Sequence, residues 1–116
     1  QRTYTVCGTP EYMAPEILRG SGHNKGCDYW SLGVLIFEML HGHTPFAARS
    51  DNVLCSNIIC GSINFEEGTK PARDLIRNLL NRDSKVRLGC RPRGVRDIAE
   101  HAWFATFDWR SLEKRS

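Results

Sequence analysis

The stretch DYWSLGVLIFEML, from Asp28 to Leu40, decides the fold class of this chain. It predicts a helix, with Asp28 as a good N-cap and with Gly42 and then Pro45 following its end. Its apolar residues cover nearly the whole circumference of that helix. A helix that is apolar all round is buried all round, so we expect it to be the central helix of its domain. A chain of 116 residues can hardly wrap such a helix alone.

Shorter helices are predicted on both sides of this one. Proline suits the first turn of a helix, because its missing N–H has no partner there, and this favours a short helix after Ala14. Later apolar residues recur at the spacing of a single helical face. No segment alternates as a half-buried strand does, so the chain is predicted to be mainly α. The predicted helices are Pro15–Arg19, Asp51–Cys60, Pro71–Asn81 and Val95–His101, and the rest of residues 1–27 is predicted to be a long, functional loop.

The composition is that of one ordinary globular domain. Hydrophobic residues make up 41% and charged residues 25% of the chain, and the net charge is +3. No apolar run reaches the roughly 18 residues that span a bilayer, and the start has no signal-peptide pattern. The five cysteines include no C-x-x-C pair, which is typical of reduced thiols and gives no metal site. We therefore expect a cytoplasmic protein, with the nucleus as the alternative, and neither a membrane nor a nucleic acid as partner.

Two motifs carry a specific resemblance. Residues 5–16 read TVCGTPEYMAPE, and DYWSLGV follows from Asp28. Together they resemble the C-terminal lobe of a protein kinase, from the activation segment through the Ala-Pro-Glu motif to the helix beyond it. GVRDI at 94–98, HAWF at 101–104 and Trp109 resemble the cyclic-nucleotide-dependent branch of the AGC group of serine/threonine kinases. The similarity leaves open whether the cyclic-AMP or the cyclic-GMP enzyme is nearer.

This resemblance implies the C-terminal (large) lobe portion of the protein-kinase fold, without the small β lobe. It implies a partial kinase domain at 1–104, from the activation segment to the last lobe helix. Residues 105–116 would then be the start of the AGC C-terminal tail. The parent kinase would use ATP and Mg²⁺ to phosphorylate Ser or Thr in protein substrates that carry basic residues.

The motifs that phosphoryl transfer requires are absent from this sequence. They are a Gly-rich loop over the phosphates, a strand lysine, an H-R-D-x-x-x-x-N loop and a D-F-G triplet. We expect them before Gln1, so the chain alone is expected to bind neither ATP nor Mg²⁺ and to be inactive. The alternative is a truncated, non-catalytic binding module that docks substrates or a cyclic-nucleotide-binding regulatory subunit.

The resemblance assigns roles to five residues near the start. Thr5 matches the activation-loop phosphosite, where a phosphate adds about −1.5 to −2 charges and orders the loop by pairing with Arg; an exposed loop threonine is the alternative. Thr9 matches the threonine that contacts the catalytic Asp and Lys. Val6, Pro10 and Met13 resemble the apolar pocket for the substrate residue just after the phosphoacceptor, with simple loop packing as the alternative.

Glu11 and Glu38 resemble the acidic residues that bind basic residues upstream of the phosphoacceptor. A carboxylate binds Arg through two charge-assisted hydrogen bonds. Glu38 interrupts an otherwise apolar helix, so its carboxylate needs a partner or a wet cleft. The alternative for Glu38 is an internal salt bridge.

The remaining assignments are structural. Glu16 and Arg87 resemble the ion pair that locks the activation segment to the lobe, and both lie in this chain. In the family, Asp28 also hydrogen-bonds the backbone of the catalytic loop. Leu35 and Met39 resemble anchors of the hydrophobic spines, so we expect them in the core.

Overall fold

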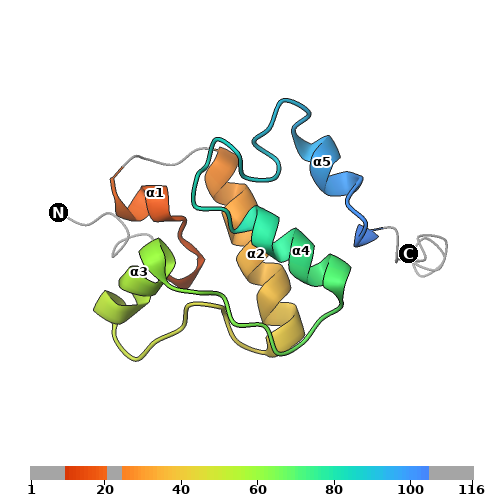
Figure 1. The fold of residues 1–116 in the computed structure, drawn as a ribbon. Coiled ribbons are helices and arrows are strands. Elements are labelled where there is room, and N and C mark those ends of the chain that lie inside the picture. The colour runs from red at the N-terminus through yellow and green to blue at the C-terminus, as the bar shows by residue number, and fades with distance from the viewer. Residues whose placement is uncertain (1–9, 21–24, 105–116) are drawn as a thin grey trace, which may run out of the picture.

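A computed structural model of the chain describes residues 10–20 and 25–104. Within these ranges the chain is helical and contains no strand, which confirms the predicted mainly α fold class (Figure 1). The elements in chain order are a short 3-10 helix η2 (Pro10–Tyr12), α1 (Pro15–Leu18), α2 (Lys25–His41), α3 (Asp51–Cys60), α4 (Lys70–Leu79) and α5 (Val95–Ala99).

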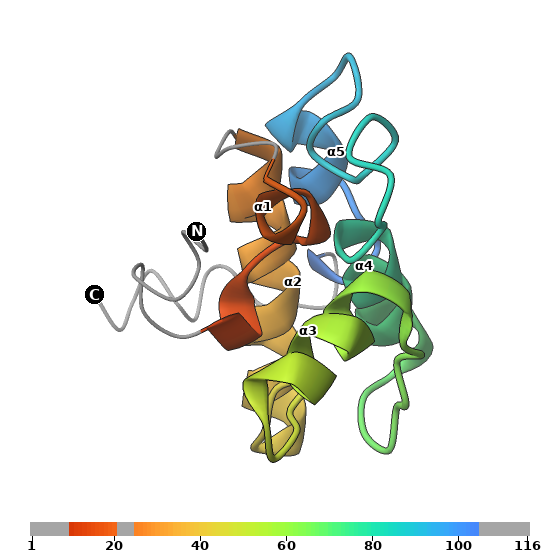
Figure 2. The same ribbon diagram turned by 90° about the vertical axis from the view of Figure 1, so that its left-hand side faces the viewer.

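Helix α2 runs through the middle of the molecule, and the other elements are arranged around it. Helix α4 packs along one side of α2, while α1, η2 and α3 lie on another, and both views agree on this arrangement (Figures 1 and 2). The contact between α2 and α4 is close at Gly33, where an added Cβ would lie 2.9 Å from Leu79 Cβ. The backbones of the two helices can approach this closely only because position 33 has no side chain.

The core lies between α2 and the elements on these two sides. Trp30 is fully buried, and its ring stacks on Phe46 at 5.8 Å between ring centroids. The guanidinium of Arg87 lies over the ring of Trp30, 5.1 Å from its centroid. The largest fully buried side chains also include those of Phe37, Ile58, Leu75, Ile76 and Leu79.

The sequence predicted Asp28 as the N-cap of α2. This prediction is wrong, because the helix begins at Lys25, three residues earlier. Gly26 and Cys27 are buried within the first turn, and the Gly26 carbonyl accepts a hydrogen bond from Arg87 Nη1 at 2.7 Å. This packing extends the helix upstream. Asp28 is exposed in the first turn, where a negative charge suits the positive end of the helix dipole. It is not a core residue of the part that the structure describes.

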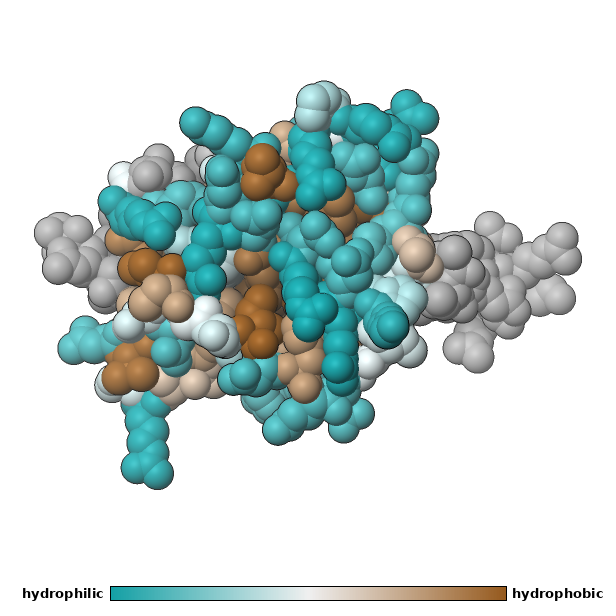
Figure 3. All heavy atoms as spheres, viewed as in Figure 1, coloured by the Kyte–Doolittle hydropathy of each residue, from teal (hydrophilic) through white to brown (hydrophobic). Residues whose placement is uncertain are grey.

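The prediction that α2 is buried all round is also wrong. Leu35 is 45% exposed and Met39 is 66% exposed, so neither is a core anchor within this chain. Residues four apart lie on one face of a helix, so these two form a single apolar face. The side chains of the other described elements pack against the remaining faces of α2 and leave this one open. The view in Figure 3 shows a mostly hydrophilic surface with separate hydrophobic patches.

Side chains cap the N-termini of α3 and α4, and α4 begins at Lys70, one residue before the predicted start. Helix α1 begins at Pro15 as predicted and ends one residue early, at Leu18. Ser50 Oγ accepts a hydrogen bond from the Val53 N–H at 3.2 Å, and Thr69 Oγ1 accepts one from the Ala72 N–H at 3.3 Å. Helix α3 has the predicted bounds. Helices α4 and α5 each end two residues early, and η2 was not predicted. No helix among the described residues is both long enough and apolar enough to cross a membrane.

Arg82 fastens the end of α3 to the rest of the molecule. Its Nε donates to the Ile58 carbonyl at 2.7 Å, and its Nη2 donates to the Asn57 carbonyl at 3.1 Å. The last carbonyls of a helix have no partner within the helix. Arg82 thus gives the Ile58 carbonyl a partner, shares the Asn57 carbonyl with the Gly61 N–H, and holds this helix beside the core.

Candidate functional site

The segment from Pro10 to Leu18 lies along the side of α2, where η2 contacts the helix (Figure 2). Ser31 on α2 holds it through a hydrogen bond from Oγ to the Tyr12 carbonyl at 2.9 Å. Pro10 begins η2. Three of the predicted site residues, Thr5, Val6 and Thr9, lie outside the residues that the structure describes, as does the predicted tail at 105–116.

Glu11 and Glu38 are brought to neighbouring places on this segment and on α2. The Tyr12 hydroxyl donates a hydrogen bond to Glu38 Oε1, and Thr44 Oγ1 donates one to Glu11 Oε1. Both carboxylates are half-buried. Because Tyr12 follows Glu11 directly in the chain, these two hydrogen bonds tie η2 both to α2 and to the turn after α2.

Neither carboxylate has a cationic partner among residues 10–20 and 25–104, where the ion pairs involve other acids. In that part of the chain, the salt bridge considered for Glu38 is replaced by a hydrogen bond from a tyrosine. A hydroxyl satisfies an acceptor oxygen but leaves the negative charge in place. The arrangement therefore presents two charges that a guanidinium or ammonium group can neutralise.

Sequence reasoning did not find the two hydroxyl donors. Tyr12 stands inside the quoted motif, but nothing in its spacing predicts a contact with Glu38, 26 residues later. Thr44 stands in the turn after α2, without any periodic pattern, and is only 4% exposed. Met13, which we assigned to the pocket for the residue after the phosphoacceptor, is also buried and is 7% exposed.

Glu16 and Arg87 lie together in the structure as a buried, two-pronged pair. Arg87 Nη1 donates to Glu16 Oε2 at 2.7 Å, and Nη2 donates to Glu16 Oε1 at 2.9 Å. Arg87 is fully buried, and its Nε donates to the Asn81 carbonyl at 2.8 Å. This guanidinium therefore joins the segment after η2 to the start of α2 and to the turn after α4.

The pKa of Glu16 is lower than that of an ordinary carboxyl group. Burial alone raises this pKa, but the hydrogen bonds and the positive charge of Arg87 outweigh it and favour the ionised form. The Cys27 thiol adds a weak hydrogen bond to Glu16 Oε2 at 3.5 Å. The pair is thus ionised at neutral pH and acts as a structural joint rather than as an acid or a base.

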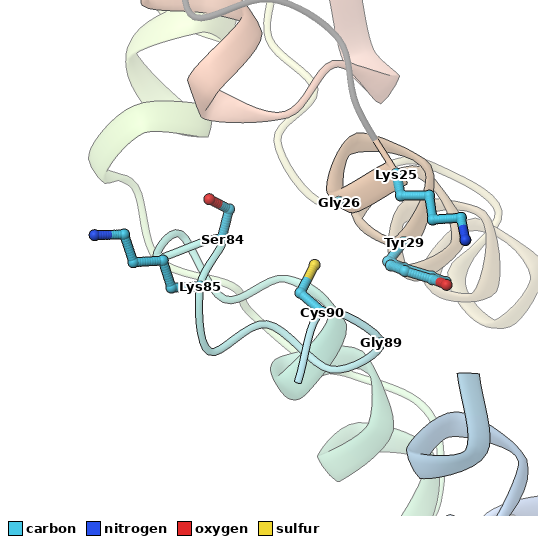
Figure 4. Close-up of a pocket in the computed structure, with 7 residues that line it drawn as sticks. All are labelled: Lys25, Gly26, Tyr29, Ser84, Lys85, Gly89 and Cys90. Atoms are coloured by element: carbon cyan, nitrogen blue, oxygen red, sulfur yellow. The ribbon is translucent and has the colours of Figure 1, made fainter. Parts of the chain in front are cut away.

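A separate cavity of about 360 Å³ lies between the start of α2 and the loop that follows α4 (Figure 4). The Cys90 thiol points into it, and the amino groups of Lys25 and Lys85 point away from one another. Burial raises the pKa of the Cys90 thiol, so it is protonated at neutral pH. Lys25 is 13 residues before Glu38 on α2, or about 20 Å along the helix. The cavity is therefore distinct from the carboxylate site.

Comparisons with known proteins agree with this geometry. The family described as "Protein kinase domain" matches residues 1–104. A cAMP-dependent protein kinase catalytic subunit of Dictyostelium discoideum is 45% identical over 115 residues, which are 98% of this chain and 18% of that protein. The cAMP-dependent protein kinase catalytic subunit 3 of Drosophila melanogaster is 46% identical over 112 residues, covering 96% of this chain and 19% of that protein.

A putative ribosomal protein S6 kinase alpha-1 of Caenorhabditis elegans is 45% identical over 113 residues, which are 97% of this chain and 14% of that protein. The chain thus spans less than a fifth of the length of each of these relatives. Three observations point to the same family. They are the region matched by the family, the helical fold without a strand among the described residues, and the sequence motifs around α2. The chain belongs to the protein kinase family, as part of the C-terminal lobe of an AGC-group kinase similar to the cAMP-dependent catalytic subunits.

Proposed function

We propose that this chain supplies the activation segment and the peptide-docking surface of a serine/threonine kinase. The whole enzyme would transfer the γ-phosphate of ATP, with Mg²⁺, to Ser or Thr near basic residues of a protein substrate. The observation that carries this proposal is the pair of half-buried carboxylates, Glu11 and Glu38, held by hydroxyl donors. The reaction class comes from the membership of the chain in the protein kinase family.

The electrostatics of the site favour an arginine ligand. A half-buried carboxylate has lost part of its hydration, and a guanidinium replaces that hydration with two parallel hydrogen bonds. Each carboxylate has one oxygen, Oε1, that accepts from a hydroxyl. Within residues 10–20 and 25–104 no donor occupies Oε2, and this is the oxygen that would bind the ligand. Charges placed in this way contribute specificity and a fast encounter with a basic peptide.

The same proposal gives roles to the residues before Glu11. Thr5 would be phosphorylated, Thr9 would contact the catalytic groups, and Val6, Pro10 and Met13 would line the pocket for the residue after the phosphoacceptor. The Glu16–Arg87 pair supports this role, because it anchors the chain just after that pocket. Phosphorylation of Thr5 would order the segment further by adding charge that Arg residues can bind.

We propose that the chain alone is inactive, because the motifs for ATP, metal and proton transfer are not in its sequence. A thermal melt with and without ATP and Mg²⁺ tests this. We expect no shift in the melting temperature, whereas a saturable shift would show a nucleotide site in this chain. The alternative of a binding module for substrates or a regulatory subunit also rests on the carboxylate pair, which forms within this chain.

Peptide binding tests the docking surface directly. The probe is a fluorescein-labelled peptide with Arg residues before a single Ser, and its matched partner has each Arg replaced by neutral citrulline. We expect the chain to prefer the Arg peptide, and the Glu11→Gln/Glu38→Gln variant to weaken its binding by about tenfold or more in fluorescence anisotropy. Citrulline-peptide binding should not change.

The matched control is Glu100→Gln, which removes one carboxylate charge just after α5 rather than on η2 or α2. Glu100 pairs with Arg93 and Arg96 at the surface, and such exposed pairs contribute little. We expect this variant to bind both peptides as the unmodified chain does. Equal affinity of the double variant and the unmodified chain for the Arg peptide would contradict the proposed function.

A further inference from the structure

The partner of Glu11 comes from the turn after α2 rather than from its own segment. Helix α2 ends at His41, and Gly42 follows with a φ of 81°, a left-handed conformation that suits glycine. This reverses the chain direction and brings Thr44 to η2. There, Thr44 Oγ1 donates its hydrogen bond to Glu11 Oε1, across 33 residues of sequence.

The turn that carries Thr44 is fixed to the core. The next aromatic residue, Phe46, is buried and stacks on Trp30, and the Phe46 carbonyl accepts a hydrogen bond from Asn57 Nδ2 at 3.3 Å. The ring Nδ1 of His43 donates to the Thr44 carbonyl at 3.0 Å. Thr44 is 4% exposed. Its hydroxyl is therefore held in place before any ligand arrives.

We propose that Thr44 is a positioning residue for Glu11: its hydroxyl fixes the carboxylate so that Oε2 faces an incoming arginine. This inference rests on the proposed function. A glutamate has three rotatable side-chain bonds, and fixing them before binding removes a cost that the ligand would otherwise meet. Because threonine carries no charge, it orients the carboxylate without competing with the ligand for it.

Tyr12 and Glu38 form a similar pair, in which the hydroxyl is on η2 and the carboxylate is on α2. In both cases a neutral hydroxyl holds one carboxylate oxygen, and no cation among the described residues holds the other. The turn after α2 thus contributes to the choice of substrate although it is remote in sequence from the segment that carries Glu11. Selection of an arginine by Glu11 would depend on a residue outside the motif.

The test compares Thr44→Val, which keeps the shape and removes the hydroxyl, with Thr44→Ser, which keeps the hydroxyl. The measured quantity is the ratio of dissociation constants for the citrulline and Arg peptides, determined with the full chain. We expect Thr44→Val to lower this ratio by about three- to tenfold and Thr44→Ser to preserve it within about twofold. Citrulline-peptide affinity should be unchanged in both, which separates positioning from a general loss of structure.

Glu11→Gln separates the failure of this inference from that of the proposed function. If Glu11→Gln lowers the ratio and Thr44→Val does not, Thr44 does not position Glu11 but the docking proposal stands. If neither Glu11→Gln nor Glu38→Gln lowers it, the docking proposal fails and this inference fails with it. Adding Thr44→Val to Glu11→Gln should lower the ratio no further, because both act through one carboxylate.

A second measurement applies if Thr44→Val does not fold. A buried, hydrogen-bonded hydroxyl exchanges its proton slowly with water, so its resonance can be followed by NMR in the unmodified chain and in Thr44→Ser. We expect a slowly exchanging Thr44 hydroxyl proton whose exchange rises several-fold in Glu11→Ala, which removes the acceptor oxygen. The same exchange rate in the presence and absence of the Glu11 carboxylate would overturn the inference.

Discussion

Arg87 shows how much of this structure depends on a single side chain. Its guanidinium binds both oxygens of Glu16 and two backbone carbonyls, and it lies over the ring of Trp30. A charge that is fully buried is tolerated only when its donors all have partners. The protein meets this condition with groups from three different segments. Removal of any one partner of Arg87 is therefore expected to destabilise all three segments.

We expect Glu16→Gln to lower the free energy of unfolding by roughly 3–5 kcal/mol, because it leaves the Arg87 charge buried without its counter-ion. The measurement is urea unfolding followed by tryptophan fluorescence, to which the buried Trp30 contributes. Glu100→Gln is the matched control, and its unfolding midpoint should stay close to that of the unmodified chain, since its ion pairs are exposed. Similar midpoints for both variants would mean that the buried pair contributes little.

Stability should also depend on pH through Glu16. Its pKa is lower in the folded chain than the ordinary value of 4.5, so the folded state favours the ionised carboxylate. The resulting stabilisation is complete above about pH 4.5 and is lost as the pH falls through the folded-state pKa. The difference in stability between the unmodified chain and Glu16→Gln should shrink over this range. A difference that stayed constant down to pH 3 would contradict the pairing.

Cys90 should react slowly with alkylating agents at neutral pH. Burial raises its pKa, and the thiolate is the reactive form. We expect modification by iodoacetamide, followed by mass spectrometry of the Cys90 peptide, to accelerate steadily between pH 7 and pH 10. Cys27, which is 1% exposed, should remain unmodified while the chain is folded. Rapid modification of Cys90 at pH 7 would show that its thiol is ionised.

At the scale of the helices, apolar periodicity predicted most of the fold. Helix α3 has its predicted bounds, and α4 begins within one residue of the predicted Pro71. The Ser50 and Thr69 caps were not used in that prediction and became evident only in the structure. The start of α2 was missed because Asp28 resembles an N-cap, whereas the packing of Cys27 and the hydrogen bond to Gly26 extend the helix. That packing depends on Arg87, 61 residues later, which no local signal reveals.

The two carboxylates of the candidate site were named from the sequence, whereas the groups that hydrogen-bond to them were not. The resemblance of the motif indicated Glu11. Glu38 was indicated by the resemblance and also by its position, because an acidic side chain within an apolar helix needs a partner or a wet cleft. The donors to these acids were not predicted, since Thr44 reaches Glu11 only after the chain turns at Gly42. Exposure was also misjudged at Leu35 and Met39, because hydrophobicity says how much burial a side chain favours and not what is available to cover it.

Gly33 tests the contact between α2 and α4. Alanine normally stabilises a helix interior relative to glycine by about 1 kcal/mol. Here its Cβ would meet Leu79 Cβ at 2.9 Å and Leu80 Cδ2 at 3.0 Å, so the helices would have to separate. We expect Gly33→Ala to lower the free energy of unfolding by about 1–3 kcal/mol, measured in urea. A stabilised variant would mean that the two helices are not in such close contact.

At the scale of the whole molecule, the open apolar face of α2 should limit solubility. Leu35 and Met39 are adjacent on this face and largely exposed. Exposed apolar patches favour association in water. We expect the chain to self-associate as its concentration rises, and Leu35→Gln/Met39→Gln to remain monomeric to a higher concentration in sedimentation equilibrium. Val53→Gln, at a residue that is 52% exposed on α3, is the control and should change association less.

The distance in sequence between Glu16 and Arg87 also affects how the protein is made. The Glu16–Arg87 pair joins residues that are 71 apart in the chain. The segment that carries Glu11 and Glu16 therefore leaves the ribosome before Arg87, which anchors it, has been synthesised. At a synthesis rate of about 5–20 residues per second, that interval lasts roughly 4–14 s. During this time Glu16 has no counter-ion, and the start of the chain is accessible to chaperones and to modifying enzymes. The proposed docking surface is thus anchored only after the turn beyond α4 has been translated, 71 residues after Glu16.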